Sequence, residues 1–561
     1  MFLKMFCNVI LIITLFTVNY AYANEARRPN IIIIMVDDLG FSDLKSYGGE
    51  LDTPTIDALA NKGMKFSQFY NAARCVPSRA ALLTSLYPHQ AGLGHMVSDL
   101  GSDAYRGELS KNTVTIAQVL SDQGYFTAMT GKWHVTKNWH PVDVKDNWPL
   151  QRGFDRFYGT LPGHGSLYDP FGLVEGNQPV KLEKGAYYTD VIGQKSVAYI
   201  EEAIIKDKPF FLYMSHVAPH YPLHAKPAMI AKQKGKFSAG WDALRAQRHA
   251  NLVDLGLVDK GIKLSPRDEQ VPAWEKEPNQ AWQQHRMEVY TAMMSHVDQS
   301  ITNVIDVLKE KKQLDNTYIF FLSDNGASPE GHLNNTVERL GSPWNSAVIP
   351  KNTPQGKKVT AGDWVNTSIG APDSYGSYGI KWANLSNTPF RNHKTWMHEG
   401  GIAAPFIVMG PKIAENSLSH QPVHIIDLMP TVLDFADASY PDTYQGNVIK
   451  AMSGLNISLL LTKQKTLPER TLFWEHEGNK AIRKGDWKLV AEYPGSWAGV
   501  RDYPNKGKWE LYNIANDRTE LNNLAKTHQD KVTALAKEWQ QWADEVGVVP
   551  WQNLIKFDKT D

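Results

Sequence analysis

Four continuous apolar segments constrain the fold of this chain more than any other feature. They lie at 30–36, 125–129, 209–214 and 318–322. Because they do not alternate with polar residues, they are typical of strands covered on both faces, as in parallel sheets between helices. The intervening segments with helical apolar spacing are 54–62, 113–123, 193–206 and 283–312. The sequence therefore predicts an α/β domain with a mostly parallel mixed sheet between helix layers.

Each apolar segment is followed by polar side chains. Asp37 and Asp38 follow the first, Lys132 and His134 the second, His216 and His220 the third, and Asp324 and Asn325 the fourth. Ligands of open α/β sheets bind beyond the carboxyl ends of the strands. We therefore expect these side chains to meet in one site.

Asp37, Asp38, Asp324 and Asn325 all offer hard oxygen atoms. Three neighbouring carboxylates repel one another unless a cation lies between them, and an all-oxygen set favours Ca²⁺ or Mg²⁺ over Zn²⁺. The alternative for Asp37 and Asp38 alone is an ordinary turn or helix cap. The second acidic pair, after a comparable strand, favours the metal site.

The segment 75–84 predicts a short helix that begins at a cysteine. Pro77 suits a first helical turn, and residues 80–83 are good helix formers. In such a helix Cys75 and Arg79 are four positions apart and share a face, next to free backbone N–H groups. This arrangement predicts an anion site.

Residues 1–23 have the pattern of a secretory signal peptide, with an apolar stretch before Ala21-Tyr22-Ala23. Its removal takes Cys7 away and leaves Cys75 as the one remaining cysteine. In an exported protein such a cysteine is free, paired with another chain, or chemically modified. We expect a periplasmic or secreted protein with no membrane span after cleavage; a lipoprotein anchor is the weaker alternative, because Cys7 precedes the apolar stretch.

Two motifs resemble a known family. They are Cys75-Val76-Pro77-Ser78-Arg79, followed by Leu82-Leu83-Thr84, and the segment from Gly124 to His134. Together they resemble the signatures of the type I sulfatases, the formylglycine-dependent sulfatases, and bacterial arylsulfatases in particular. Ser85 departs from the family, which usually has glycine there.

The resemblance implies a set of roles. Cys75 would be converted by a formylglycine-generating maturation enzyme to 3-oxoalanine (formylglycine), whose hydrate is the nucleophile. The implied metal ligands, for Ca²⁺ with Mg²⁺ possible, are Asp37, Asp38, Cys75, Asp324 and Asn325. The implied catalytic residues beside Cys75 are Arg79, Lys132, His134, His220 and Lys394. Lys132 and His134 would point the same way in an extended segment, while His89, His164, His216 and His393 are expected to be structural or to lie in the outer pocket.

The length of 561 residues predicts two domains. We expect a catalytic domain over 24–465 and a smaller C-terminal α+β subdomain over 466–561. The second would hold an antiparallel sheet of strands at 471–475, 480–483, 487–493 and 509–512, and a helix at 532–546. Within the first, 225–282 contains a short helix around 241–255. The aromatic-rich segment 327–392 either forms a wall of the substrate pocket or packs on itself.

The predicted function is an exported sulfatase acting on sulfate esters of a small molecule or, with more weight, of a carbohydrate. The aromatic residues of 327–392 and the segment Trp474-Glu475-His476-Glu477 could bind the sugar. A formal net charge of zero gives no basis for nucleic-acid binding. The alternatives are a phosphonate or phosphate monoester hydrolase with the same site, and a carbohydrate-binding pseudosulfatase with unmodified Cys75.

Overall fold

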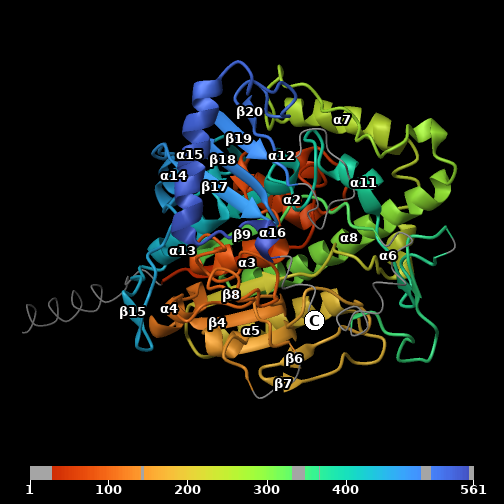
Figure 1. Ribbon diagram of the computed structural model, residues 1–561. Helices are drawn as coiled ribbons and strands as arrows, with labels where there is room; N and C mark the ends of the chain where they lie inside the picture. Colours follow the sequence, from red (N-terminus) through yellow and green to blue (C-terminus); the bar gives the residue numbers. More distant parts are fainter. Residues whose placement is uncertain (1–27, 140–143, 332–347, 366, 494–506, 555–561) are drawn as a thin grey trace, which may run out of the picture.

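The computed structural model describes residues 28–139, 144–331, 348–365, 367–493 and 507–554. A large mixed sheet forms its centre (Figure 1), with the strand order β13-β2-β12-β9-β1-β8-β4-β5-β6-β7. Its outer strands are β13 (Ser417–Ser419) and β2 (Met64–Phe66) at one end and β6 (Leu173–Glu175) and β7 (Gln178–Pro179) at the other. The predicted signal peptide lies outside the described residues. Within them, no helix combines the length and the apolar character needed to cross a bilayer.

The four predicted strands are the central neighbours of this sheet. They are β9 (Thr317–Ser323), β1 (Asn30–Val36), β8 (Phe210–Ser215) and β4 (Phe126–Lys132), and they pair in parallel. Further strands extend the sheet on both sides, among them β5 (Arg156–Thr160) and β12 (Phe406–Met409). Because β12 runs antiparallel to β9, the sheet is mixed. The predicted α/β fold is confirmed.

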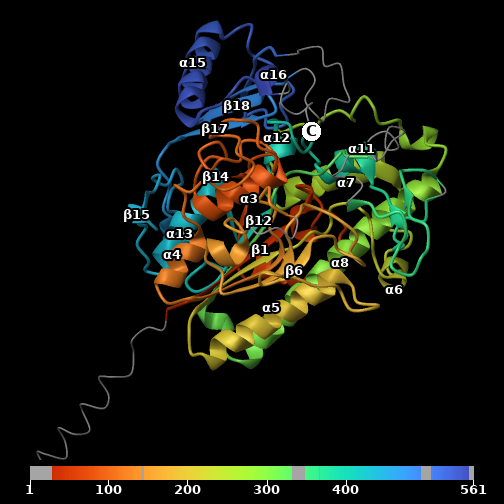
Figure 2. The same ribbon diagram turned by 60° about the horizontal axis from the view of Figure 1, so that its bottom comes forward.

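Strand β1 shows why the apolar runs do not alternate. Ile32 and Ile34 pack into a core on one face of the sheet, together with α5 (Tyr188–Ile205) and α8 (Gln280–Glu310). Ile31 and Ile33 pack into a second core on the other face, with α3 (Cys75–Thr84), α4 (Ile116–Asp122) and α13 (Leu428–Phe435). Figure 2 shows α5 and α8 on one side of the sheet and α3, α4 and α13 on the other.

The expected helices are present with small shifts at their ends. The first, α2, spans Pro54–Asn61, and the helix around Trp241 is α7 (Gly240–Asp254). Helix α4 begins three residues later than expected, because Thr115 caps it: the Thr115 hydroxyl accepts from the Gln118 N–H at 3.1 Å. Helix α5 begins earlier, at Tyr188, because Tyr188 and Ile192 are buried in the core.

A separate antiparallel sheet lies near the C-terminus. It consists of β17 (Thr471–His476), β18 (Asn479–Lys484), β19 (Trp487–Ala491) and β20 (Glu510–Asn513). Helix α15 (Gln529–Val546) covers it, as Figure 1 shows, with Trp539 and Trp542 buried. The predicted α+β region is confirmed, while the domain boundary after residue 465 stays a prediction.

Candidate active site

The parallel pairing of β1 and β9 places the two acidic pairs together. Val36 lies opposite Ser323, so Asp37 and Asp38 leave one strand where Asp324 and Asn325 leave its neighbour. The Asp38 N–H donates to Asp324 Oδ1 at 3.3 Å, and Asn325 Nδ2 donates to Asp38 Oδ1 at 2.6 Å. All four side chains are buried.

Three cations face these oxygen atoms. Arg79 donates to Asp324 Oδ2 at 2.7 Å, Lys132 Nζ lies 2.5 Å from Asp37 Oδ2, and Lys394 Nζ lies 2.9 Å from Asp38 Oδ1. They come from α3, the end of β4 and the loop after residue 387, so the site joins distant parts of the chain. We call these residues, with Cys75 and His220, the strand-end site.

Charge and burial shift the carboxyl groups in opposite directions. Burial, and then the charge of Asp37, raises the pKa of Asp324 to about 7 against the pull of Arg79. Burial opposes ionisation of Asp37 as well, but Lys132, with His220, Arg79 and Lys394, holds its pKa well below the usual range. Burial therefore outweighs the neighbouring cations at Asp324, whereas the cations outweigh burial at Asp37.

Cys75 is the first residue of α3, and its side chain is buried among these charges. Arg79 lies one turn further along the same helix, as the spacing predicts. Burial raises the pKa of the Cys75 thiol, although Lys132 and Lys394 act in the opposite direction. An unmodified Cys75 is therefore a thiol at neutral pH and a weak nucleophile.

His220 and His134 are both buried next to the charged residues of the strand-end site. His220 Nε2 is 3.5 Å from Asp38 Oδ2, and its ring lies 5.2 Å from that of His164. The His134 ring lies against Gly163, where an added Cβ would come 2.3 Å from the ring. Burial, followed by Lys132 and Arg79, lowers the pKa of His134 well below its ordinary value, so this ring is neutral.

The expectation of an extended segment from Lys132 to His134 is wrong. Strand β4 ends at Lys132, and His134 has a left-handed φ of 57°. The Trp133 N–H donates to the Thr160 carbonyl at 2.9 Å and the His134 N–H to the Leu161 carbonyl at 3.1 Å, so the chain stays beside the segment that follows β5. The left-handed φ of His134 nevertheless departs from the two-residue period of a strand.

The residues fit a divalent cation. Asp37 Oδ1 and Asn325 Oδ1 are buried and have no hydrogen-bond partner among the described residues. Oxygen atoms of Asp37 and Asp38 and a His220 nitrogen lie within 4.8 Å of one another. Buried oxygen atoms without partners are costly unless a ligand satisfies them. Their hardness matches Ca²⁺ or Mg²⁺.

Sequence reasoning missed Arg74 and Glu330. Glu330 Oε2 lies 3.2 Å from Lys394 Nζ, and Glu330 Oε1 lies 3.3 Å from the Arg74 guanidinium. Lys394, followed by Arg74, outweighs burial and holds the pKa of Glu330 well below its usual range. Arg74 could have been found from its position just before Cys75, and Glu330 from its position near the start of the segment 327–392.

Four histidines expected to be structural or peripheral have varied surroundings. His216 pairs with Ser300 at 3.2 Å, His89 with Glu475 at 2.7 Å, and His393 with Asp268 at 3.4 Å. These contacts lie outside the strand-end site. His164 is the exception, since its ring packs on His220.

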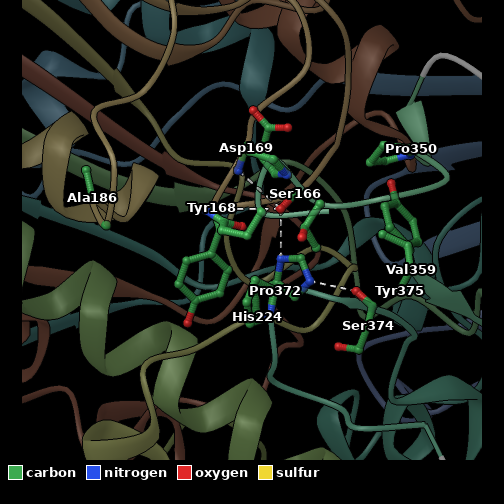
Figure 3. Close-up of a pocket in the computed structure, with 14 residues that line it drawn as sticks. Ser166, Tyr168, Asp169, Ala186, His224, Pro350, Val359, Pro372, Ser374 and Tyr375 are labelled. Carbon is green, nitrogen blue, oxygen red and sulfur yellow. Dashed lines mark hydrogen bonds between the residues drawn. The ribbon is translucent and has the colours of Figure 1, made fainter. Parts of the chain in front are cut away.

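Some residues of the segment 327–392 pack in the core, and others line a pocket. Trp382 packs in the core against Trp241, and Tyr378 stacks on Tyr290 at 4.6 Å. Tyr375 instead lines a pocket of about 200 Å³ (Figure 3), together with Ser166, Tyr168, Asp169, His224, Thr353, Val359 and Ser374. The Tyr375 ring lies 6.4 Å from that of His164, so this pocket is close to the strand-end site. Trp344 lies outside the described residues.

Comparisons with known proteins agree with this geometry. The sulfatase family pattern matches residues 29–438, and the pattern of the N-sulphoglucosamine sulphohydrolase C-terminal region matches 391–545. An uncharacterized sulfatase of Schizosaccharomyces pombe is 32% identical over 94% of this chain and 95% of its own length. An arylsulfatase of Klebsiella aerogenes is 31% identical over 78% of this chain and 93% of its own length.

Solved structures show the same similarity. The crystal structure of Ps i-CgsB has 25% identity and a TM-score of 0.64, over 92% of this chain and 93% of that one. The structure of BT4656 with D-glucosamine-2-N,6-O-disulfate has 21% identity and a TM-score of 0.61, over 95% of this chain and 100% of that one, and it shows the shared fold alone. With a family pattern that covers most of the chain and relatives above 30% identity, this chain belongs to the sulfatase family and is a sulfuric ester hydrolase.

Proposed function

We propose that this chain is an exported sulfatase that removes sulfate from a carbohydrate, with formylglycine formed from Cys75 and a divalent cation at the strand ends. The observation that carries the proposal is the convergence of Asp37, Asp38 and Asp324 with Arg79, Lys132 and Lys394 around the start of α3. Such a set can bind a cation and an anion side by side.

The state of Cys75 supports modification. A buried thiol with a raised pKa is poorly activated, whereas a formylglycine at this position supplies, as its hydrate, two hydroxyl groups on one carbon. The residues that would hold the cation are Asp37, Asp38, Asp324, Asn325 and residue 75. A cation there would supply Lewis acidity at the sulfate oxygens.

The cationic side chains would bind and orient the sulfate. Arg79 is fixed by Asp324 and by the Ser215 hydroxyl at 2.5 Å, so its guanidinium cannot swing away. Lys132 and Lys394 add two further donors at the ends of other segments. Charge that is already oriented stabilises a developing anion without reorganisation.

Proton transfer would fall to Asp324, His134 and His220. Burial and Asp37 raise the pKa of Asp324 to about 7 without a cation, and a bound cation would favour the ionised carboxylate. We assign to this carboxylate the role of base beside the nucleophile. Burial also lowers the pKa of His220, but Asp38 at 3.5 Å favours its protonated form. We assign His220, with Lys394, to the leaving oxygen, and neutral His134 to the regeneration of the aldehyde.

The carbohydrate assignment is supported by the pocket next to the site. The pocket combines two tyrosine rings, Tyr168 and Tyr375, with the polar groups of Asp169 and Ser166 (Figure 3). Rings and a few polar groups are the usual lining of a ligand site. The similar protein Ps i-CgsB has also been solved in complex with k-i-k-neocarrahexaose, at 25% identity.

The decisive test of the nucleophile is the mass of the tryptic peptide that spans residues 75–79. Conversion of the CH₂SH group to an aldehyde makes this peptide lighter than the sequence requires. The matched control is Cys75→Ala, whose peptide must show its encoded mass. An unshifted wild-type peptide from an active preparation would overturn the formylglycine assignment.

The substrate class is tested by parallel assays of aryl sulfate, phosphate and phosphonate esters, followed by a panel of sulfated glycans. We expect the sulfate ester to be preferred and at least one glycan to release sulfate. A preference for phosphate would contradict the assigned reaction. Release from the aryl ester but from none of the glycans would contradict the carbohydrate assignment alone.

A further inference from the structure

A second group of possible metal ligands lies where the C-terminal sheet meets the catalytic body. Glu477 occupies the turn between β17 and β18, and His476 is the last residue of β17. His95 comes from the loop after α3, and its ring lies 4.7 Å from that of Trp551 in α16 (Trp551–Leu554). These three residues have no part in the mechanism above.

The donor atoms of these residues converge. His95 Nδ1 and His476 Nε2 each lie 3.6 Å from the same oxygen, Glu477 Oε1, and the three ligand atoms lie within 4.8 Å of one another. Tetrahedral Zn²⁺ with bonds of about 2.1 Å holds its ligand atoms roughly 3.4 Å apart. The observed spacing is close to this value.

Both nitrogen atoms are buried and lack hydrogen bonds to the described residues. His476 is 0% exposed, and its other nitrogen, Nδ1, faces the Gly94 carbonyl at 3.4 Å. A carbonyl on Nδ1 favours the tautomer whose Nε2 lone pair points into the cluster, which is the usual support of a metal-bound histidine.

We propose that His95, His476 and Glu477 form a transition-metal site, best suited to Zn²⁺, that ties the β17–β18 hairpin to the catalytic body. Two imidazoles and one carboxylate form a typical zinc set, with the fourth position open to water. The strand-end site offers mainly oxygen, so the two sites differ in the metals they prefer.

Arg74 competes with a metal for Glu477, since its guanidinium lies 3.7 Å from Glu477 Oε1. It also lies 3.3 Å from Glu330, and that second carboxylate retains it when a metal takes Glu477. Arg74 directly precedes Cys75, so the metal would fix the hairpin next to the start of the nucleophile helix. The proposal does not depend on which ester the enzyme hydrolyses.

The test measures bound metal on the full chain. Purified protein is incubated with Zn²⁺ or Co²⁺, desalted, and analysed for metal content, and the Co²⁺ form is examined for the intense visible absorption of tetrahedral cobalt. We expect one equivalent of metal. His476→Gln and Glu477→Gln should each weaken binding by at least about 100-fold. Mutation of a residue that only supports a metal ligand lowers metal affinity by about 10-fold to 100-fold, and loss of the ligand itself should lower it further.

Two controls make the result specific. His89→Gln removes a buried histidine of the same interface that bonds to Glu475, and it should keep the Zn²⁺. Asp37→Asn with Asp38→Asn disables the strand-end site and should keep it as well. The proposal is overturned if the wild type retains no Zn²⁺, if Glu477→Gln and His476→Gln bind it as the wild type does, or if the double variant alone loses it.

A second measurement guards against variants that do not fold. Zn²⁺ should raise the thermal midpoint of the wild type and of His89→Gln, because a ligand that binds the folded state stabilises it. It should leave the midpoint of Glu477→Gln unchanged. An equal rise in all three proteins would contradict the site.

Discussion

Two buried ionic clusters in this molecule contain the same types of residue, but one is suited to catalysis and the other to structural stability. The strand-end site leaves two oxygen atoms, of Asp37 and Asn325, without hydrogen bonds among the described residues, and it raises the pKa of Asp324 to about 7. The second cluster joins the catalytic body to the C-terminal sheet, and we call it the domain-joining network. Its members are Tyr70, Glu399, Arg483, Lys488, Arg518 and Glu520.

The domain-joining network satisfies its central acid. Glu399 Oε1 accepts from Lys488 at 2.9 Å, while Glu399 Oε2 accepts from the Tyr70 hydroxyl at 2.9 Å and from Arg518 at 3.2 Å. Despite burial, Lys488, Arg518 and Arg483 lower the pKa of Glu399 to about 2. Full pairing of the central acid is typical of a structural cluster, even though Arg518 Nη2 and Glu520 Oε1 in the same network have no hydrogen bond among the described residues. A carboxyl group with a strongly raised pKa is typical of a functional cluster.

The largest expected effect is a loss of activity without a loss of stability. Cys75→Ala should lower kcat on an aryl sulfate by about 10⁴-fold to 10⁶-fold, because removal of a nucleophile leaves only binding and charge stabilisation. The thermal midpoint should change little, since the side chain is small and lies at a helix start. Parallel kinetics and thermal denaturation check this, and residual activity within about tenfold of the wild type would rule out residue 75 as the nucleophile.

The strands that carry the strand-end site could be predicted from the sequence because a few strong local signals determine them. Four apolar runs predicted four neighbouring strands, and parallel strands bring their carboxyl ends to one edge. Asp37 and Asp324 could thus be grouped from the sequence although they are 287 positions apart, the same separation as between Asp38 and Asn325. Lys394 needed the family resemblance, because a loop carries it into place, and so did the catalytic role of His220.

The domain-joining network was not predicted from the sequence at all. Glu399 begins the short helix α12 (Glu399–Ile402) and Lys488 lies in β19, and only the packing of these distant elements brings the two side chains together. Short strands such as β2 (Met64–Phe66) were missed for a similar reason, since three residues carry too little periodicity. Long-range packing decides both features.

The second-largest expected effect is a loss of stability. Glu399→Ala should lower the free energy of unfolding by about 3 to 5 kcal/mol, because it leaves Arg518 as a buried cation without its carboxylate and leaves Lys488 with Glu520 alone. Denaturant titration followed by tryptophan fluorescence measures this. The matched control is Asp306→Ala, which breaks an exposed pair with Lys309 and should cost at most about 0.5 kcal/mol. Equal losses would show that the network contributes no more than a surface pair.

Acid should act on the domain-joining network over a defined range. The pKa of Glu399 falls from 4.5 to about 2 on folding, so its contribution is complete above about pH 4.5 and disappears as the pH falls towards 2. The contribution lost is on the order of 3 kcal/mol. Glu399→Gln should therefore show a flatter dependence of the thermal midpoint on pH in this range. An unchanged slope in the variant would contradict the assignment.

Removal of metal should affect the strand-end site and spare the network. If a divalent cation fills that site at about 100 times its dissociation constant, a chelator should cost about 2.7 kcal/mol of stability and abolish turnover. Ca²⁺ or Mg²⁺ added back should restore both. Asp37→Asn with Asp38→Asn should already lack this response. A wild type whose midpoint and activity both resist the chelator would exclude an exchangeable cation.

The smallest expected effect lies at the far end of the nucleophile helix, at the position where the family usually has glycine. Ser85 ends α3 with a left-handed φ of 58°, which favours glycine by roughly 1 kcal/mol. The Ser85 hydroxyl, however, donates to the Ile426 carbonyl at 2.8 Å and accepts from the Gly454 N–H at 3.2 Å. Two hydrogen bonds of about 1 kcal/mol each offset the backbone cost. Ser85→Gly should therefore shift the free energy of unfolding by about 1 kcal/mol or less and leave kcat unchanged, whereas Ser85→Ala, which loses the bonds and keeps the strain, should be the less stable of the two.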